Sequence, residues 1–222
     1  AEPFAYSACP DEVIKMYIED EQGIDERSIR LEITRYSGTI SENTVKYSTT
    51  DPQLAFLTGD TLLFTPDPSF TDGELIRVCL NACDDVLHNP LETVLCWEFT
   101  MDLSAPLYTN EQPAAGTTLI TRTTPVSVNI FDEITDVDIN SISVQINNLT
   151  AGSVINLVQG DAGINYTPSD SLLEIYPDIL GIEWTGGDSI CVTVTCFDTP
   201  SDSSDTLFDQ YYCEPNLAEY IW

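Results

Sequence analysis

The sequence predicts an all-β protein made of two tandem antiparallel β-sandwiches. Its length of 222 residues suits two such domains of about 100 residues each. Apolar and polar residues alternate in runs of roughly four to eight, the period of a half-buried strand. An internal repeat indicates that one β-rich unit is used twice.

The repeat is clearest where residues 13–33 align with residues 126–146 without a gap. The matched residues include Val13 with Val126, Asp25 with Asp138, Ser28 with Ser141 and Ile29 with Ile142. Further along, residues 62–67 resemble 172–178, residues 73–84 resemble 187–198, and residues 97–99 resemble 218–220. We therefore expect the same series of strands in each unit, about seven per unit.

The elements within each unit are expected to be strands because their apolar period is two. The clearest runs place apolar residues at Ile76, Val78, Leu80 and Ala82, and at Ile190, Val192, Val194 and Cys196. Turn clusters such as Thr71-Asp72-Gly73 separate the runs. Residues 12–19 also fit a helix, but their copy contains Pro125 and β-branched residues, which favour a strand.

The boundary between the units is placed within residues 100–106, where the last strand of the first unit ends and Pro106 begins an edge strand. The predicted domains are residues 1–102 and residues 103–222. Such a short linker predicts an elongated rod with a fairly fixed angle between the domains.

The charge of the chain limits its partners. There are 37 acidic and 7 basic residues, a net charge of -30, while 42% of the residues are hydrophobic, enough for normal cores. This negative field repels phosphate backbones and anionic lipid, so we expect no nucleic-acid partner. No apolar stretch approaches the roughly 18 residues that span a bilayer, so we expect no membrane insertion.

The seven cysteines indicate an oxidising compartment, and therefore a secreted protein located outside the cell or on its surface. The opening Ala-Glu-Pro fits a mature terminus after leader removal, and a fragment of a longer protein would look the same. The expected disulfides are Cys83–Cys96, Cys9–Cys79, and Cys196 or Cys191 with Cys213, with one thiol left free or joined to another chain. Zinc is the alternative, although paired Cys-x-x-Cys units are missing.

Several motifs together resemble the tandem bacterial immunoglobulin-like (Big-type) domains of cell-surface proteins. These motifs are an Asp-rich loop followed by Ser-Ile, a Leu-x-Phe-x-Pro stretch, an Asp-Gly-x-x-x-x-Val stretch, and Trp-Glu-Phe-Thr-Met-Asp shortly before Ala-Pro. The resemblance implies that both sandwiches are immunoglobulin-like. Proteins of that kind serve as stalks, adhesins, fibres, surface layers or spacers in secreted enzymes. The cysteines depart from the common cysteine-free pattern.

Acidic residues concentrate in loops that such a topology brings to the pole where each domain begins. The candidate ligands are Glu19, Asp20, Asp25 and Asp84 in the first domain, Asp102 in the linker, and Asp132, Glu133, Asp136, Asp138 and Asp198 in the second domain. Calcium takes about six to eight oxygen ligands, so Ca²⁺ is the cofactor these carboxylates could hold, and it would stiffen the joint. The alternative is solvated loops in which Asp and Ser cap turns.

Catalytic motifs are not evident. The single histidine, His88, lies in a turn-like segment, no Gly-x-Ser-x-Gly elbow accompanies it, and a Gly-rich phosphate loop is missing. Trp97 and Trp184 could stack on a sugar, but at strand positions they are better explained as core residues. We therefore expect a protein that is not an enzyme and has no small-molecule substrate.

The function expected from the sequence is that of an extracellular structural protein, a rod-like module or the repeating subunit of a fibre or surface layer. Its expected partners are copies of itself or other surface proteins, joined through sheet edges whose backbone groups are unpaired. The alternative is an adhesin or a carbohydrate- or ligand-binding accessory module of a larger secreted protein. An exposed aromatic platform would support that alternative.

Overall fold

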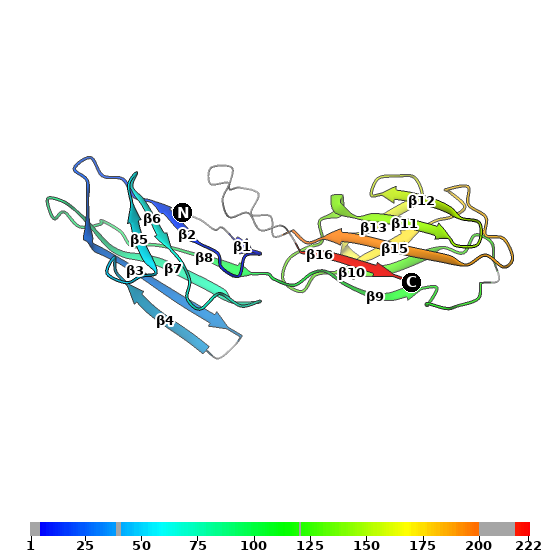
Figure 1. Cartoon of the computed structure of the whole chain (residues 1–222), viewed down its shortest axis with the longest axis horizontal. Coiled ribbons are helices and arrows are strands. Elements are labelled where there is room, and N and C mark those ends of the chain that lie inside the picture. Colours follow the sequence, from blue (N-terminus) through cyan, green and yellow to red (C-terminus); the bar gives the residue numbers. More distant parts are fainter. Residues whose placement is uncertain (1–4, 39–40, 120, 200–215) are drawn as a thin grey trace. The chain divides into compact units, whose positions relative to one another are not determined.

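The computed structural model describes residues 5–38, 41–119, 121–199 and 216–222. They form two compact units, residues 5–103 and residues 104–199 together with 216–222. Both units consist of β-strands arranged in two sheets each (Figure 1). Neither of the two short 3₁₀ helices in the described part, Ile139–Ser141 and Pro168–Asp170, is long or apolar enough to cross a lipid bilayer. The prediction of an all-β protein is confirmed.

The first unit contains eight described strands. They are β1 (Ala5–Ser7), β2 (Ile14–Tyr17), β3 (Ile24–Ser37), β4 (Ser41–Tyr47), β5 (Leu54–Leu57), β6 (Thr61–Phe64), β7 (Leu75–Asp85) and β8 (Leu95–Met101). One sheet has the order β1-β8-β7-β3-β4 and the other has the order β2-β6-β5. All pairs are antiparallel except β1 with β8, which is parallel. The strand β2 confirms that residues 12–19 do not form a helix.

The second unit also contains eight described strands. They are β9 (Leu107–Gln112), β10 (Val126–Phe131), β11 (Ser143–Asn148), β12 (Ser153–Val158), β13 (Ile164–Thr167), β14 (Leu172–Ile175), β15 (Ile190–Phe197) and β16 (Leu217–Ile221). One sheet has the order β13-β14-β10-β9 and the other has the order β12-β11-β15-β16. All of these pairs are antiparallel.

The pairing order of seven strands is the same in both units. The series β4-β3-β7-β8 corresponds to β12-β11-β15-β16, and β5-β6-β2 corresponds to β13-β14-β10. Only the first strand differs, because β1 pairs with the last strand of its unit whereas β9 pairs with β10. The structure therefore repeats the unit that the sequence repeats.

Each unit has its own hydrophobic core, built from the alternating faces of its strands. The first core includes Ile14, Leu31, Ile33, Val78 and Phe99, and the second includes Val128, Ile142, Val144, Leu173 and Val194. All ten side chains are at most 3% exposed. Full burial of such a side chain contributes about 1.5 to 3 kcal/mol, so burial of these faces is the main stabilisation of each unit.

The registers of the last strands correct one part of the sequence alignment. Val78 faces Trp97 in the first unit, and Val192, which occupies the equivalent place, exchanges backbone hydrogen bonds of 2.8 and 3.0 Å with Trp222. The place of Trp97 is therefore taken by Trp222, and the alignment of residues 97–99 with 218–220 is wrong. A shift of four residues keeps the same side chains facing inward, so a period of two cannot reveal it.

A tyrosine joins the two sheets of the second unit. The hydroxyl of Tyr108, on β9, lies 3.2 Å from the carbonyl oxygen of Ala218, 3.3 Å from that of Val194 and 3.2 Å from Sγ of Cys196. These three acceptors belong to β15 and β16 of the opposite sheet. Burial raises the pKa of Tyr108, so the hydroxyl keeps its proton and can donate at neutral pH.

We expect Tyr108→Phe to lower the free energy of unfolding of the second unit by about 1 to 3 kcal/mol, because buried acceptors lose their donor. Urea denaturation followed by circular dichroism measures this change. The control is Tyr17→Phe, since Tyr17 is 63% exposed, and it should change stability by less than about 0.5 kcal/mol. Equal effects of the two substitutions would show that the Tyr108 hydroxyl does not stabilise the unit.

Candidate functional site

A short Asp-x-x-Ser motif lies at the start of β3, directly after the acidic loop that follows β2. Oδ1 of Asp25 accepts a hydrogen bond of 3.1 Å from the backbone N–H of Arg27. The hydroxyl of Ser28 donates to the carbonyl of Asp25 at 2.7 Å and accepts from the backbone N–H of Asp84 at 2.6 Å. The motif caps a turn in the irregular first part of β3 and attaches this part to β7.

The second unit repeats this motif between β10 and β11. Oδ1 of Asp138 accepts from the N–H of Asn140 at 3.0 Å. The hydroxyl of Ser141 donates to the carbonyl of Asp138 at 2.6 Å and accepts from the N–H of Phe197, on β15, at 2.8 Å. Asp25 and Asp138 thus both have a structural role in their loops, as the alternative of turn-capping residues predicted.

Two other carboxylates of the second unit lie close together. One oxygen of Asp132 and one of Asp198 are within 4.8 Å of each other. Asp198 is 1% exposed and accepts hydrogen bonds from the backbone N–H and the side-chain amide of Asn216, at 2.9 and 2.7 Å. Two neighbouring carboxylates repel each other unless a proton or a cation lies near them.

Asp132 uses only one of its two oxygens for hydrogen bonding. Oδ1 accepts from the backbone N–H groups of Ile134 and Thr135, both at 2.9 Å. Oδ2 is buried and has no hydrogen-bond partner among the described residues. A buried carboxylate oxygen without a partner costs free energy, so Oδ2 is the group of this loop that is best suited to accept a cation.

The other predicted ligands are placed differently. Glu19, Asp20, Glu133 and Asp136 are exposed, and Asp84 is partly buried in β7. Within the part of the chain that the structure describes, Glu19, Asp20, Asp25, Asp84, Glu133, Asp136 and Asp138 do not converge in groups of three that could hold one ion. Asp102 belongs to the first unit, where its backbone N–H donates to the carbonyl of Ser7 at 2.9 Å. Its proposed approach to the acidic loop of the second domain stays a prediction.

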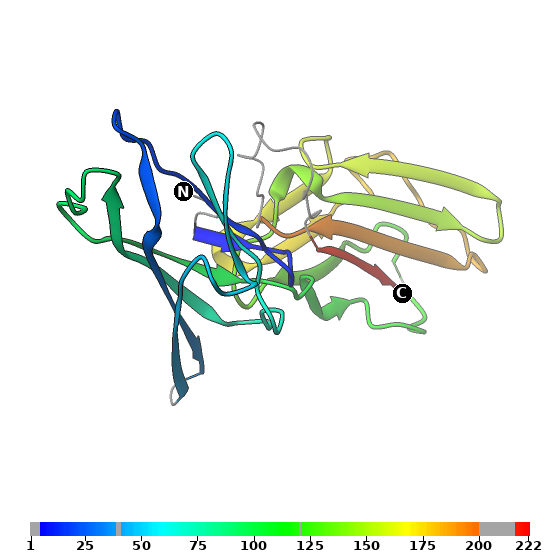
Figure 2. The same ribbon diagram turned by 60° about the vertical axis from the view of Figure 1, so that its left-hand side comes forward.

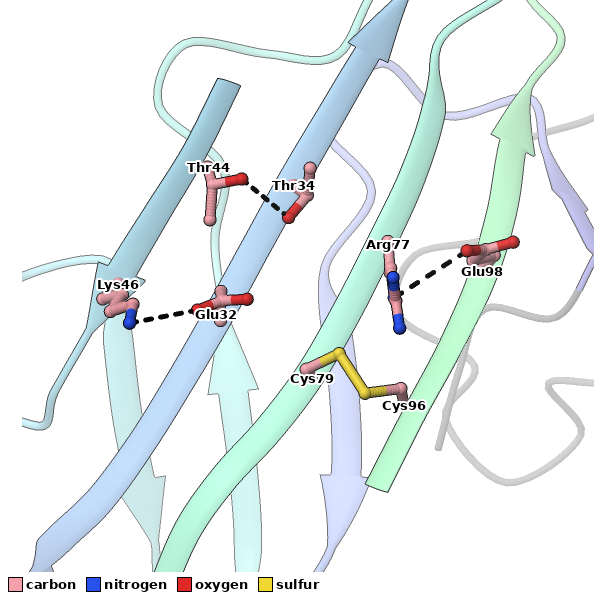
Figure 3. The surroundings of a disulfide bond; sticks show 8 residues. All are labelled: Glu32, Thr34, Thr44, Lys46, Arg77, Cys79, Cys96 and Glu98. Carbon is pink, nitrogen blue, oxygen red and sulfur yellow. Dashed lines mark hydrogen bonds and ion pairs between the residues drawn. A yellow bond between two sulfur atoms is a disulfide. The ribbon is translucent and has the colours of Figure 1, made fainter. Parts of the chain in front are cut away.

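The structure corrects the predicted disulfides. Cys96 is bonded to Cys79, not to Cys83. Cys79 and Cys96 lie directly opposite each other on β7 and β8, with their Cα atoms 4.2 Å apart. Figure 3 shows them on the same sheet face as the ion pair of Arg77 and Glu98.

Cys83 does not pair with Cys96 because the β7–β8 register places Cys79 opposite Cys96 and Cys83 four positions further along β7. A β-bulge also turns the side chain of Cys83 to the other face of the sheet. In the β3–β7 ladder, Arg30 faces Ala82 and the next residue, Leu31, faces Leu80, so Asn81 is an extra residue on β7. One extra residue reverses which side chains face inward. Cys83 therefore lies in the core of the first unit and is 5% exposed.

The remaining cysteine predictions are also partly wrong. Cys9 is disulfide-bonded, but not to Cys79, since Cys79 is bonded to Cys96. Cys191 and Cys196 are free thiols, so the predicted pairing of either one with Cys213 is wrong; Cys213 itself lies outside the described residues. Burial raises the pKa of Cys196 to about 11, which keeps this thiol protonated and unreactive at neutral pH.

The histidine and the two tryptophans occupy structural positions, although Trp184 lies between β14 and β15 and not in a strand as predicted. His88 is exposed in a turn and has a φ of 66°. Its backbone N–H donates to the backbone carbonyl of Asp85 at 3.0 Å. Trp184 is 9% exposed and belongs to the second core, while Trp97 packs against the first. The interpretation of both tryptophans as core residues is confirmed. Among the described large hydrophobic side chains, the exposed aromatics are Tyr6 and Tyr17.

Comparison with known proteins adds no further assignment. No protein-family model matches the chain, and no curated protein matches it. The resemblance to bacterial immunoglobulin-like domains therefore stays a prediction.

Proposed function

We propose that this chain is a non-enzymatic extracellular structural protein, a stalk module or the repeating subunit of a cell-surface fibre or surface layer. The observation that carries the proposal is the repeated pairing order of seven strands in two units, each with its own buried core. In such a molecule the side chains that face each other inside a unit serve packing, so sheet faces, edges and loops are left for contacts with partners.

The proposal includes an immunoglobulin-like topology for both units. The immunoglobulin fold pairs its first, second, fourth and fifth strands in one sheet and its third, sixth and seventh strands in the other. In the second unit the sheet β13-β14-β10-β9 corresponds to the first of these, and β11-β15-β16 corresponds to the second, with β12 added beside β11. The first unit differs by the transfer of its first strand to the other sheet.

Extracellular localisation is supported by the disulfides. The bond between Cys79 and Cys96 and the bonded state of Cys9 require an oxidising environment. A net charge of -30 keeps such a surface protein soluble and sets it apart from nucleic-acid binders.

Sheet edges offer a mechanism for assembly. The strand β12 lies at one edge of its sheet and β16 at the other. Both carry exposed apolar side chains, namely Val154, Val158, Leu217 and Ile221, which are 50–57% exposed. An edge with unpaired backbone groups and apolar side chains can add a strand from another chain.

We propose calcium as the cation of the acidic loop of the second unit, with Asp132 and Asp198 as its protein ligands there. The proposal is supported by the short distance between their carboxylates and by the unpartnered Oδ2 of Asp132. Calcium accepts carboxylate oxygens and completes its shell with carbonyl oxygens and water.

The decisive experiment is electron microscopy of the purified native protein with and without a calcium chelator. We expect ordered polymers that come apart when calcium is removed, and Asp132→Asn should produce the same loss without chelator. Asp136→Asn is the matched control, since Asp136 is an exposed carboxylate of the same loop. Discrete monomers under all conditions would contradict the structural function and favour a binding module, and polymers that resist chelation would contradict only the calcium site.

A further inference from the structure

The sheet β12-β11-β15-β16 of the second unit carries almost no charge, although the chain is strongly acidic. The described strands of this sheet contain one charged residue, Glu219 on β16. In Figure 2 the strands lie side by side, from β12 and β11 (yellow-green) through β15 (orange) to β16 (red). The other sheet of the unit contains two carboxylates, Glu111 on β9 and Glu174 on the inner strand β14. The outer side of the first sheet is therefore the less charged of the two.

The outward side chains of β11, β12 and β15 form a surface that we call the neutral face. They alternate along their strands with core residues such as Val144, Leu157 and Val194. The neutral face includes Ser143, Gln145, Val154, Asn156, Val158 and Thr195. The two valines are 50% and 54% exposed, and both amide side chains are exposed as well. The face is thus open to solvent and combines apolar with uncharged polar groups.

Hydrogen bonds within the neutral face hold its polar side chains in place. Nε2 of Gln145 donates to Oδ1 of Asn156 at 3.0 Å. The hydroxyl oxygens of Ser143 and Thr195 are 2.6 Å apart. Side chains that are ordered before binding lose less conformational entropy when a partner covers them. Polar groups that are already paired also cost less free energy to bury.

The two units can be compared residue by residue at this face. Val78 and Val192 occupy equivalent places on β7 and β15. Val78 faces Ile33 on β3, and Val192 faces Ile146 on β11. The residues before these two isoleucines therefore correspond to each other, and so do their partners on β4 and β12.

An ion pair of the first unit is replaced by an uncharged pair in the second. Glu32 and Lys46 lie opposite each other on β3 and β4, and their charged groups are 3.4 Å apart (Figure 3). Their counterparts are Gln145 and Asn156, which lie opposite each other on β11 and β12. An ion pair resists burial because both charges lose their hydration, whereas the amide pair has no charge to desolvate. A partner can therefore cover this place more easily in the second unit than in the first.

A second copy of the chain is the partner that fits the neutral face best. Two chains that each carry a net charge of -30 repel each other, most strongly between charges that come within a Debye length of about 8 Å. Contact through strands without charge avoids close pairs of carboxylates. Hydroxyl and amide side chains both donate and accept hydrogen bonds, so the face can pair with an identical face around a two-fold axis.

We propose that the neutral face is a homotypic interface, at which the sheets of two copies pack face to face. Burial of Val154 and Val158 contributes the hydrophobic stabilisation of this contact. Gln145, on the middle strand of the face, lies close to its own copy. The inference rests on the proposed structural function and deepens it, because it names a surface through which copies of the chain assemble.

The test is sedimentation velocity of the full chain over a range of protein concentrations, with a calcium chelator present so that calcium-dependent contacts do not contribute. We expect a reversible dimer that becomes more stable as the salt concentration rises, because salt screens the repulsion between acidic chains. Gln145→Glu should raise the dissociation constant at least about tenfold, since it brings two like charges together. Asn165→Glu, at an exposed position of the other sheet, is the matched control and should leave the dissociation constant nearly unchanged.

A mixing experiment identifies the partner as a second copy. Gln145→Lys should weaken the dimer as Gln145→Glu does, because like charges meet again. An equimolar mixture of the two variants should restore the dimer, because opposite charges then face each other. Gln145 is exposed, so the melting temperatures of both variants, followed by circular dichroism, should match that of the natural chain.

Monomers of the natural chain at every concentration, or dimers that Gln145→Glu leaves unaffected, would overturn the inference. Weakened dimers that the mixture does not restore would overturn it as well, since the face then does not meet its own copy. Calcium-dependent polymers that form equally well from Gln145→Glu would contradict the neutral face alone. The expected dimers from a protein that never polymerises in the microscope would contradict the structural function and leave the interface standing.

Discussion

Arg35→Ala is expected to lower the free energy of unfolding of the first unit by about 3 to 5 kcal/mol, because it leaves a buried carboxylate without its partner. Arg35 and Glu74 form two hydrogen bonds of 2.6 and 3.1 Å, and their side chains are 17% and 7% exposed. The guanidinium also donates to the carbonyls of Pro68 and Ser69 at 2.9 and 2.8 Å, and lies 4.9 Å from the ring centre of Phe70.

Urea denaturation of the variant measures the effect, and Arg77→Ala is its control. Arg77 pairs with Glu98 at 3.8 Å, but these side chains are 47% and 52% exposed, so the control should cost less than about 1 kcal/mol. If both variants lose the same stability, the burial of the Arg35–Glu74 pair has no special importance.

The same pair predicts a dependence on pH. Burial by itself raises the pKa of Glu74, but hydrogen bonds from Arg35 and from the backbone N–H of Thr71 outweigh it and hold the pKa below its ordinary value. A lowered pKa stabilises the folded state above the unfolded pKa of about 4.3, and this stabilisation is lost as the pH falls through the folded value. As the pH falls from about 4.3 through the folded pKa of Glu74, the free energy of unfolding should therefore decrease more steeply in the natural chain than in Glu74→Gln.

Removal of the disulfide is the second change with a large expected effect. Cys79 and Cys96 are separated by 17 positions in the sequence, and a loop of that size is worth about 3 kcal/mol in the chain-entropy treatment. We therefore expect the double variant Cys79→Ser, Cys96→Ser to lower the free energy of unfolding of the first unit by about 2 to 4 kcal/mol. Urea denaturation under non-reducing conditions measures the loss without disturbing the bond of Cys9.

Cys191→Ser is the control for this variant, because Cys191 is a free, partly buried thiol. It should leave the first unit unchanged. If the double variant unfolds at the same urea concentration as the natural chain, the cross-link adds nothing to the stability already provided by the β7–β8 ladder.

Strand content and core positions could be predicted from the sequence because both follow from a period of two. Ile76, Val78 and Leu80 are buried as that period predicts. The disulfide could not be predicted in the same way. It depends on the β7–β8 register, which places Cys79 opposite Cys96, while the extra residue Asn81 turns Cys83 into the core. An alternating pattern gives neither the register of a strand pair nor the position of a bulge.

For the candidate site, the sequence predicted where acidic residues gather but not which of them could bind a cation. The sequence showed that acidic residues gather in two repeated loops, but an aspartate that caps a turn and one that can accept a cation have the same side chain. Oδ1 of Asp138 accepts a hydrogen bond from the backbone N–H of Asn140 in its own loop. Oδ2 of Asp132, in contrast, is buried and has no hydrogen-bond partner among the described residues. That distinction depends on backbone N–H directions, which the sequence pattern does not give. The alignment also placed Ala218, not Trp222, in the position of Trp97, because a shift of four residues leaves the inward and outward faces unchanged.

The different position of the first strand gives the two units different responses to a pulling force. In the first unit, β1 and β8 are the first and last strands and are bonded to each other in parallel, so tension on the two ends shears their hydrogen bonds at the same time. In the second unit, β9 and β16 belong to separate sheets, and tension passes between them through side-chain packing and the Tyr108 hydroxyl. If the chain carries load in the stalk or fibre that we propose, we expect the first unit to withstand a higher force before unfolding than the second.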